Sequence, residues 1–281
     1  MTQTSLSYQD VSANGAGIPA LGFGTFRMSG ADTRRMVKHV LGLGYRHIDT
    51  AQIYGNEAEV GEGLAASGVA RGEIFLTTKV WVENYPHDAF IASVDESLKK
   101  LKTDHVDLLL LHWPNQAVPL AEQVDALNEV RQAGKVRHIG VSNFNTALMA
   151  EAIRLSDAPL VTNQIEYHPY LNQTKVIEAA CEAGLSVTAY YGMADGKVFE
   201  DEVLKDIAAR HNRSVAQIVL RWLVQQNGVV ALSKTVSEKR AAENLAIFDF
   251  SLNADDMAVI SALAVPGGRL VSPEGLAPGW D

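Results

Sequence analysis

Short apolar runs alternate with amphipathic stretches along most of this chain. Within one stretch, apolar residues recur three and four positions apart at Phe90, Val94, Leu98 and Leu101, which is the spacing of an α-helix. Glycine commonly separates a stretch from the next apolar run, as a helix terminator does. The apolar runs predict eight strands, at residues 22–25, 47–49, 75–79, 106–111, 138–141, 161–165, 186–190 and 229–232.

Eight strand–helix units predict a closed (β/α)8, or TIM, barrel formed by residues 1–281 as a single domain. About 250 residues is the usual size of such a barrel, and parallel strands buried on both faces read as continuous apolar runs. We expect residues 1–20 to form a hairpin that plugs the barrel's bottom and residues 265–281 to form a C-terminal tail. An open doubly wound sheet is the competing fold, but the Gly-x-Gly-x-x-Gly turn that it needs lacks its third glycine at residues 22–27.

Ionisable side chains end three of the apolar runs. Asp49 ends the second run, Lys79 the third and His112 the fourth, and Tyr54 lies in the loop that follows Asp49. In a (β/α)8 barrel the carboxyl ends of the strands meet at one face, and active sites are found there. The pattern therefore predicts that these four groups lie together in a catalytic site.

The sequence around these residues resembles that of the aldo-keto reductase family. The similar segments are GYRHIDTA at 44–51, YGNE at 54–57, TKVW at 78–81, LHWP at 111–114 and IGVSNF at 139–144. They run in order from about residue 18 to residue 244 and are typical of prokaryotic-type members that reduce small aldehydes and sugar-derived dicarbonyls. The resemblance implies an NAD(P)H-dependent oxidoreductase that reduces a carbonyl to an alcohol without a metal.

Carbonyl reduction needs a hydride donor and an acid that protonates the carbonyl oxygen. We expect Tyr54 to be this acid. The pKa of a free tyrosine is about 10, so we expect the ammonium of Lys79 to lower the pKa of Tyr54. Asp49 would hold Lys79 charged through an ion pair, and His112 would hydrogen-bond the carbonyl oxygen. The resemblance implies the same four roles.

The resemblance implies NADPH or NADP+ as the cofactor, with NADH as the alternative. Barrels often bind phosphate through the loops after strands seven and eight, where Lys234, Thr235 and Arg240 would hold the adenosine 2′-phosphate. The other cofactor residues implied are Glu243 and Asn244 at the adenine, Ser142, Asn143 and Gln164 at the nicotinamide carboxamide, Tyr190 stacked on the nicotinamide ring, and Gly24, Thr25, Phe26 and Asp49 beside them.

Two segments depart from the family's pattern. Ser233 stands where proline or a small apolar residue is usual, and YGMA at 191–194 replaces the usual Ser-Pro-Leu-Gly. The second departure affects the loop that covers the cofactor's pyrophosphate. The sequence therefore leaves open whether residues 191–196 cover it here.

Aromatic residues after several strands predict an apolar slot for the substrate. The residues that would line it are Phe26, Tyr54, Trp81, His112 and Trp113. Because the loops after the strands are short, we expect an open pocket for a small-molecule carbonyl substrate, such as a small aldehyde, a dicarbonyl or a sugar-derived ketone. Trp280 in the tail either caps this pocket or packs on the barrel.

Composition and charge narrow the partners and the compartment. The 24 basic and 33 acidic residues give a formal net charge of −9, which disfavours binding to nucleic acid or an anionic membrane. Residues 1–7 lack signal-peptide features, and the longest apolar run is too short to span a bilayer. Cys181, the single cysteine, is expected to pack as a small hydrophobe, and the histidines do not form a metal-binding cluster. A monomeric cytoplasmic enzyme is the simplest prediction.

Two other functions stay open at this point. Lys79 at a strand end would suit a Schiff-base aldolase, which needs no nicotinamide. An NADPH-binding sensor or interaction protein with negligible turnover would also carry the cofactor residues. The match at Asp49 and Tyr54 argues against the aldolase, and the presence of all four ionisable groups disfavours an inactive sensor.

Overall fold

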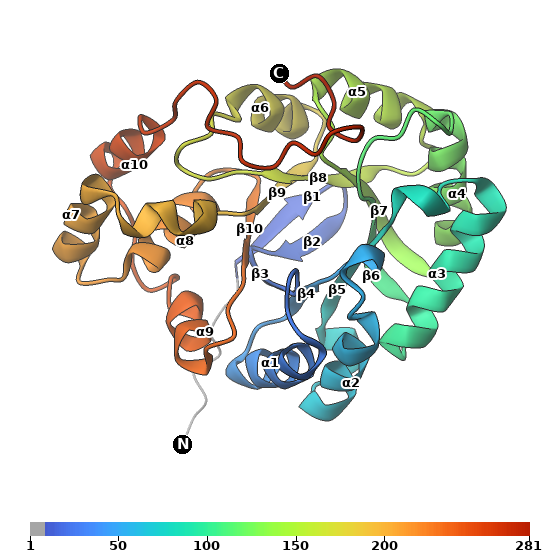
Figure 1. Ribbon diagram of the computed structural model, residues 1–281, viewed down its shortest axis with the longest axis horizontal. Helices are drawn as coiled ribbons and strands as arrows, with labels where there is room; N and C mark the ends of the chain where they lie inside the picture. The colour runs from blue at the N-terminus through green and yellow to red at the C-terminus, as the bar shows by residue number, and fades with distance from the viewer. Residues whose placement is uncertain (1–8) are drawn as a thin grey trace.

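The computed structural model describes residues 9–281 and has a closed ring of eight parallel strands at its centre (Figure 1). The order around the ring is β10-β3-β4-β5-β6-β7-β8-β9, so each strand lies beside its neighbours in the chain and the last closes on the first. This confirms the predicted (β/α)8 barrel. Residues 1–8, part of the segment expected to form the hairpin, lie outside the described residues.

The barrel strands are short, and helices lie outside them. The strands of the ring are β3 Leu21–Gly24, β4 His47–Asp49, β5 Phe75–Val80, β6 Val106–Leu111, β7 Val136–Ser142, β8 Leu160–Glu166, β9 Ser186–Tyr190 and β10 Val229–Ser233. The α-helices are α1 Gly30–Leu43, α2 Glu57–Ser67, α3 His87–Leu101, α4 Leu120–Gln132, α5 Thr146–Leu155, α6 Thr174–Glu182, α7 Glu202–His211, α8 Val215–Val224, α9 Glu238–Leu245 and α10 Ala254–Ser261. Short 3-10 turns are η1 Gln52–Tyr54, η2 Arg71–Glu73, η3 Val82–Asn84 and η4 Ala194–Phe199.

A two-stranded hairpin closes the amino end of the barrel, as the sequence predicts. Strands β1 Asp10–Ala13 and β2 Ala16–Pro19 pair antiparallel, and Figure 1 shows them across the centre of the ring. Ala13 and Ile18 of the hairpin are buried against Leu108 and Val161 from the inner face of the barrel. Burial of these apolar side chains removes the hollow that an open ring would leave at this end.

Glycine ends the first helix in the way that the sequence pattern indicates. Gly44 follows α1 with a φ of 118°, and its N–H donates to the carbonyls of Leu41 and Val40. A residue with a side chain adopts this left-handed conformation at a cost, which explains glycine at the turn into β4. Strand β4 then begins three residues later and delivers Asp49 to the carboxyl end of the ring. Among residues 9–281, none of the helices is both long and apolar enough to cross a membrane.

Candidate active site

The four ionisable groups expected at the strand ends lie together. Asp49 is the last residue of β4, Lys79 is the penultimate residue of β5, and His112 directly follows β6. Tyr54 ends the turn η1 after β4. Lys79 Nζ lies 2.6 Å from Asp49 Oδ1 and 3.4 Å from the Tyr54 hydroxyl, and the Tyr54 and His112 rings are 5.7 Å apart. The carboxyl ends of three neighbouring strands thus converge on one cluster.

The ion pair at the centre of this cluster is sealed from solvent. The side chains of Lys79 and Asp49 are 0% and 3% exposed. Lys79 Nζ also donates to the carbonyl of Thr50 at 2.8 Å, and Asp49 Oδ2 accepts a 2.8 Å hydrogen bond from Gln164 Nε2. Gln164, which was expected at the nicotinamide carboxamide, therefore also donates a hydrogen bond to Asp49. A fully bonded pair of this kind has little freedom to move.

The direction of the Tyr54 pKa shift differs from the sequence-based expectation. Burial and the charge of Asp49 raise the pKa of Tyr54 well above its usual range, although Lys79 is close by. Burial lowers the pKa of Lys79, opposed by Asp49, and burial with the nearby Lys79 charge lowers the pKa of His112 well below its usual range. Tyr54 therefore keeps its proton and His112 is neutral at neutral pH. Low-dielectric surroundings outweigh the single ammonium because they penalise the phenolate directly.

Aromatic side chains surround the hydroxyl of Tyr54. The Phe26 ring lies 4.9 Å from the Tyr54 ring, and the Trp81 ring lies 5.4 Å from the His112 ring. Phe26 is 43% exposed, so one face of its ring is open to solvent or a ligand. The Phe26 and Trp81 rings thus lie beside the Tyr54–His112 pair, and the apolar slot that they would line stays a prediction.

Trp113 and Trp280 connect this slot to the C-terminal tail. Trp113 is buried, and its ring meets the Trp280 ring at 6.3 Å with their planes 70° apart. The other side of Trp280 carries the guanidinium of Arg269, whose Cζ lies 3.6 Å from the ring centroid. The tail is held at its end, where the Asp281 carboxylate accepts from the N–H and hydroxyl of Thr146. Trp280 thus packs on the barrel through Trp113.

Residues at the carboxyl ends of β7 and β9 form a second polar group beside the cluster. The Tyr190 hydroxyl donates to Asn143 Oδ1 at 2.6 Å, and Asn143 Nδ2 donates to the carbonyl of His112 at 3.0 Å. Asn143 has a φ of 63°, a left-handed conformation that asparagine tolerates better than most residues. Ser142 Oγ donates to the carbonyl of Gln164 at 2.8 Å. The four residues expected around the nicotinamide ring and its carboxamide are therefore neighbours.

Two cations near the N-terminus of α9 have no acidic partner among the described residues. Lys234 and Arg240 are exposed, and neither forms an ion pair with any residue in the described range 9–281. Ser237 caps the helix by accepting from the Arg240 N–H, and Thr235 Oγ1 accepts from the Ser237 N–H. Lys239, by contrast, lies 3.8 Å from Glu243. Free cations at a helix N-terminus are well suited to bind a phosphate.

The two departures from the family's pattern have local explanations. Ser233 Oγ lies 3.2 Å from the hydroxyl of the buried Tyr45. In the loop after β9, the Tyr191 hydroxyl donates to Asp195 Oδ1 at 2.5 Å, and Arg27 Nη1 lies 3.5 Å from the same hydroxyl. Arg27, Tyr191 and Asp195 all have positive φ. The loop after β9 is therefore joined to the loop after β3, which carries Phe26.

Three polar residues near the cluster were not assigned from the sequence. Asn56 Nδ2 donates to the carbonyl of Thr25, and its Oδ1 accepts from the Thr50 hydroxyl. Glu57 is buried and accepts from the Thr78 hydroxyl at 2.6 Å, and Gln52 bonds residues from two other segments. Asn56 and Glu57 belong to the YGNE segment, but a hydrogen-bonding role cannot be read from residue type alone.

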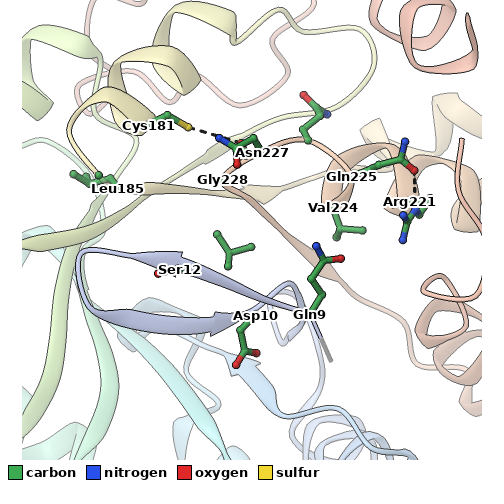
Figure 2. A pocket seen from close by; sticks show the side chains of 13 residues that line it. Gln9, Asp10, Ser12, Cys181, Leu185, Arg221, Val224, Gln225, Asn227 and Gly228 are labelled. Carbon is green, nitrogen blue, oxygen red and sulfur yellow. Dashed lines mark hydrogen bonds between the residues drawn. The ribbon is translucent and has the colours of Figure 1, made fainter. Parts of the chain in front are cut away.

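A hollow of about 450 Å³ lies at the opposite end of the barrel (Figure 2). It is lined by Gln9, Asp10, Cys181 and Arg221 among others, and it is separate from the four ionisable groups. Cys181 Sγ lies 3.8 Å from the carbonyl of Asn227, and burial raises the pKa of its thiol. Cys181 is half-buried and lines the hollow, and the raised pKa leaves less of its reactive thiolate at neutral pH. Within residues 9–281, the acidic, histidine and cysteine side chains do not form a group that would hold a metal ion.

Comparisons with known proteins agree with the geometry. The model of the aldo/keto reductase family matches residues 17–265. Methylglyoxal reductase DkgB of Salmonella typhimurium is 48% identical over 267 residues, which cover 94% of this chain and 99% of that protein. A solved structure that carries the name 2,5-diketo-D-gluconic acid reductase B is 65% identical, covers 98% of each chain and has a TM-score of 0.97. The aldo-keto reductase of Bombyx mori, solved in complex with NADP, is 32% identical over 92% of this chain and 94% of that chain, with a TM-score of 0.87.

Proposed function

Because this chain belongs to the aldo/keto reductase family, we propose that it uses NADPH to reduce the carbonyl group of small aldehydes and dicarbonyls, with Tyr54 as the proton donor. The observation that carries the proposal is the contact of the Tyr54 hydroxyl with the sealed Lys79–Asp49 pair. A phenol held beside a buried ammonium suits proton transfer to a carbonyl oxygen, because the ammonium stabilises the phenolate that results.

NADPH suits the residues around the cluster. Lys234 and Arg240 supply unpaired charge for a 2′-phosphate at the N-terminus of α9, and Tyr190 and Asn143 supply a ring and an amide beside the Tyr54 cluster for a nicotinamide. NADPH, when bound, supplies the hydride that adds to the carbonyl carbon. The NADP complex of the Bombyx mori relative supports the same cofactor here.

Each residue of the cluster has a distinct part in the proposed proton transfer. Tyr54 keeps its proton at neutral pH because its pKa is raised, and it donates this proton to the carbonyl oxygen as negative charge develops. Lys79, held by Asp49, then stabilises the phenolate that Tyr54 becomes. His112, neutral because its pKa is lowered, orients the carbonyl oxygen through a hydrogen bond.

The aromatic slot supports a small substrate. Phe26 and Trp81 offer flat apolar surfaces on either side of the Tyr54–His112 pair, and the loops that carry them are short. The relatives named for methylglyoxal and 2,5-diketo-D-gluconic acid are reductases of dicarbonyls, which is the substrate class that we propose. We also keep the prediction of a cytoplasmic enzyme, and the monomeric state stays a prediction.

Loss of nicotinamide absorbance with NADPH and methylglyoxal tests the proposal. Tyr54→Phe removes the donated proton and keeps the ring, so kcat should fall about 10³-fold while the Kd for NADPH changes less than about twofold. Tyr170→Phe is the matched control, because its hydroxyl bonds Asp201 and none of the four cluster residues. Equal turnover by wild type and Tyr54→Phe would contradict the role of Tyr54, and NADPH binding without turnover across a panel of aldehydes and dicarbonyls would favour the sensor.

The Schiff-base alternative has less support. Such chemistry needs a neutral and accessible lysine amine. The Lys79 side chain is 0% exposed, and its amine bonds Asp49, Thr50 and Tyr54. Lys79 is therefore better suited to an electrostatic role than to attack on a substrate.

A further inference from the structure

The side chain of Gln52 joins three separate segments next to the active site. Gln52 Oε1 accepts from the Trp81 N–H and from Asn84 Nδ2, both at 2.9 Å. Its Nε2 lies 3.0 Å from Ser93 Oγ and 3.2 Å from Ser97 Oγ. One amide offers two donors and one acceptor oxygen, and both ends of Gln52 are in use.

The three segments carry different parts of the site. Gln52 begins the single turn η1 that ends at Tyr54. Trp81 directly follows β5, two residues after Lys79, and its ring lines the slot beside His112. Ser93 and Ser97 belong to α3 on the outside of the barrel. Gln52 therefore ties the turn that carries the acid and the loop that carries a slot wall to the same helix.

A second link extends from Gln52 toward the ion pair. Ser97 Oγ accepts from Gln52 and donates to Glu57 Oε2 at 3.3 Å, and Glu57 Oε1 accepts from the Thr78 hydroxyl at 2.6 Å. Thr78 directly precedes Lys79 in β5. Glu57 and Ser97 are buried, so these bonds are shielded from competing water.

We propose that Gln52 is a positioning residue of the reductase site, which sets Tyr54 and Trp81 relative to each other. Gln52 itself donates and accepts only within the protein, so it acts through these two residues. A displacement of about 1 Å in a reacting group is enough to reduce a rate on the order of 100-fold. Because Gln52 accepts directly from the Trp81 N–H, removal of the Gln52 side chain should release Trp81 and widen the slot. This inference rests on the proposed function.

Steady-state kinetics of Gln52→Ala with NADPH and phenylglyoxal test the proposal. The KM for phenylglyoxal should rise about tenfold because Trp81 is released, and kcat should fall about tenfold because Tyr54 moves. The Kd for NADPH should change less than about twofold, since the proposed cofactor contacts do not involve Gln52. Gln225→Ala is the matched control, because both ends of its amide are also in use: it bonds Arg221 and both backbone groups of Leu252, at the opposite end of the barrel.

Two further variants separate positioning from general loss of structure. Gln52→Glu keeps an oxygen for the Trp81 N–H and should restore the KM to within about threefold of wild type. In a Trp81→Ala background, Gln52→Ala should no longer raise the KM but should still lower kcat. An unchanged KM and kcat in Gln52→Ala would overturn the proposal, and so would an equal rise in KM in both backgrounds. Absence of turnover in wild type would instead overturn the proposed function, which the Tyr54→Phe experiment tests separately.

Discussion

Buried carboxylates lie at both ends of the barrel, and their cations differ in exposure. Asp49, at the carboxyl end of β4, pairs with Lys79, whose side chain is 0% exposed. Asp107, near the amino end of β6, pairs with Arg71 at 2.7 Å and Arg137 at 2.9 Å, whose side chains are 23% and 49% exposed. Water screens the second group but not the first. A carboxylate–cation pair therefore stabilises the fold at the amino end, whereas at the carboxyl end it supplies unscreened charge for a reaction.

Removing each carboxylate charge in turn should give opposite results. Asp49→Asn leaves Lys79 without its anion beside Tyr54, and kcat should fall on the order of 100-fold to 1000-fold. Asp107→Asn should leave kcat within about twofold but lower the free energy of unfolding by about 1–2 kcal/mol, because Arg71 and Arg137 lose their charged partner yet stay in contact with water. Turnover measurements and urea unfolding check the two values. A large loss of activity in Asp107→Asn would remove the distinction between the ends.

A buried histidine at the start of β4 should make the fold sensitive to acid. His47 is 1% exposed on β4, two residues before Asp49, and burial lowers the pKa of His47 to about 4. Its pKa in the unfolded chain is about 6.5, so the folded state binds fewer protons between these values. The resulting stability is present above pH 6.5 and is lost as the pH falls toward 4, by roughly 3 kcal/mol.

Urea unfolding of wild type and His47→Asn at several pH values tests this prediction. The substitution removes the titrating group, so the fall in the free energy of unfolding between pH 6.5 and 4 should become shallower. His87→Asn is the control, because neighbouring carboxylates raise the pKa of the half-exposed His87 and the sign of its contribution is opposite. An identical pH dependence in wild type and His47→Asn would contradict the prediction.

The smallest expected effect concerns two adjacent cations on α9. Arg240→Ala should raise the Kd for NADPH about tenfold and leave the Kd for NADH unchanged, because only NADPH carries the 2′-phosphate. Lys239→Ala should change neither value, since Lys239 already lies near Glu243 on an exposed helix face. Fluorescence titration with both cofactors measures the difference. Equal weakening of NADH and NADPH by Arg240→Ala would argue against a phosphate contact.

The sequence predicts the barrel and the four catalytic candidates because both depend on local pattern. Apolar runs mark the strands, and the closed parallel topology brings the residues at their ends, such as Asp49 and Lys79, to one face. The raised pKa of Tyr54 could not be predicted in this way, since it depends on how deeply the hydroxyl is buried. The bond from Gln164 to Asp49 and the bonds of Gln52 could not be predicted either, because the partners of an amide are known only once the strands and loops are placed.

The ring closes only when β10 reaches β3. Ser233 Oγ lies 3.4 Å from the carbonyl of Gly22, a partner 211 positions earlier, and the Ala231 N–H donates to the carbonyl of Ala20 at 2.8 Å. During synthesis, one edge of β3 therefore has no partner strand until β10, near the end of the chain, has been made. An edge of this kind is a site for wrong pairing with other strands. In the cell, the rate at which the ribosome delivers the last strand thus bears on how much of this protein reaches its native form.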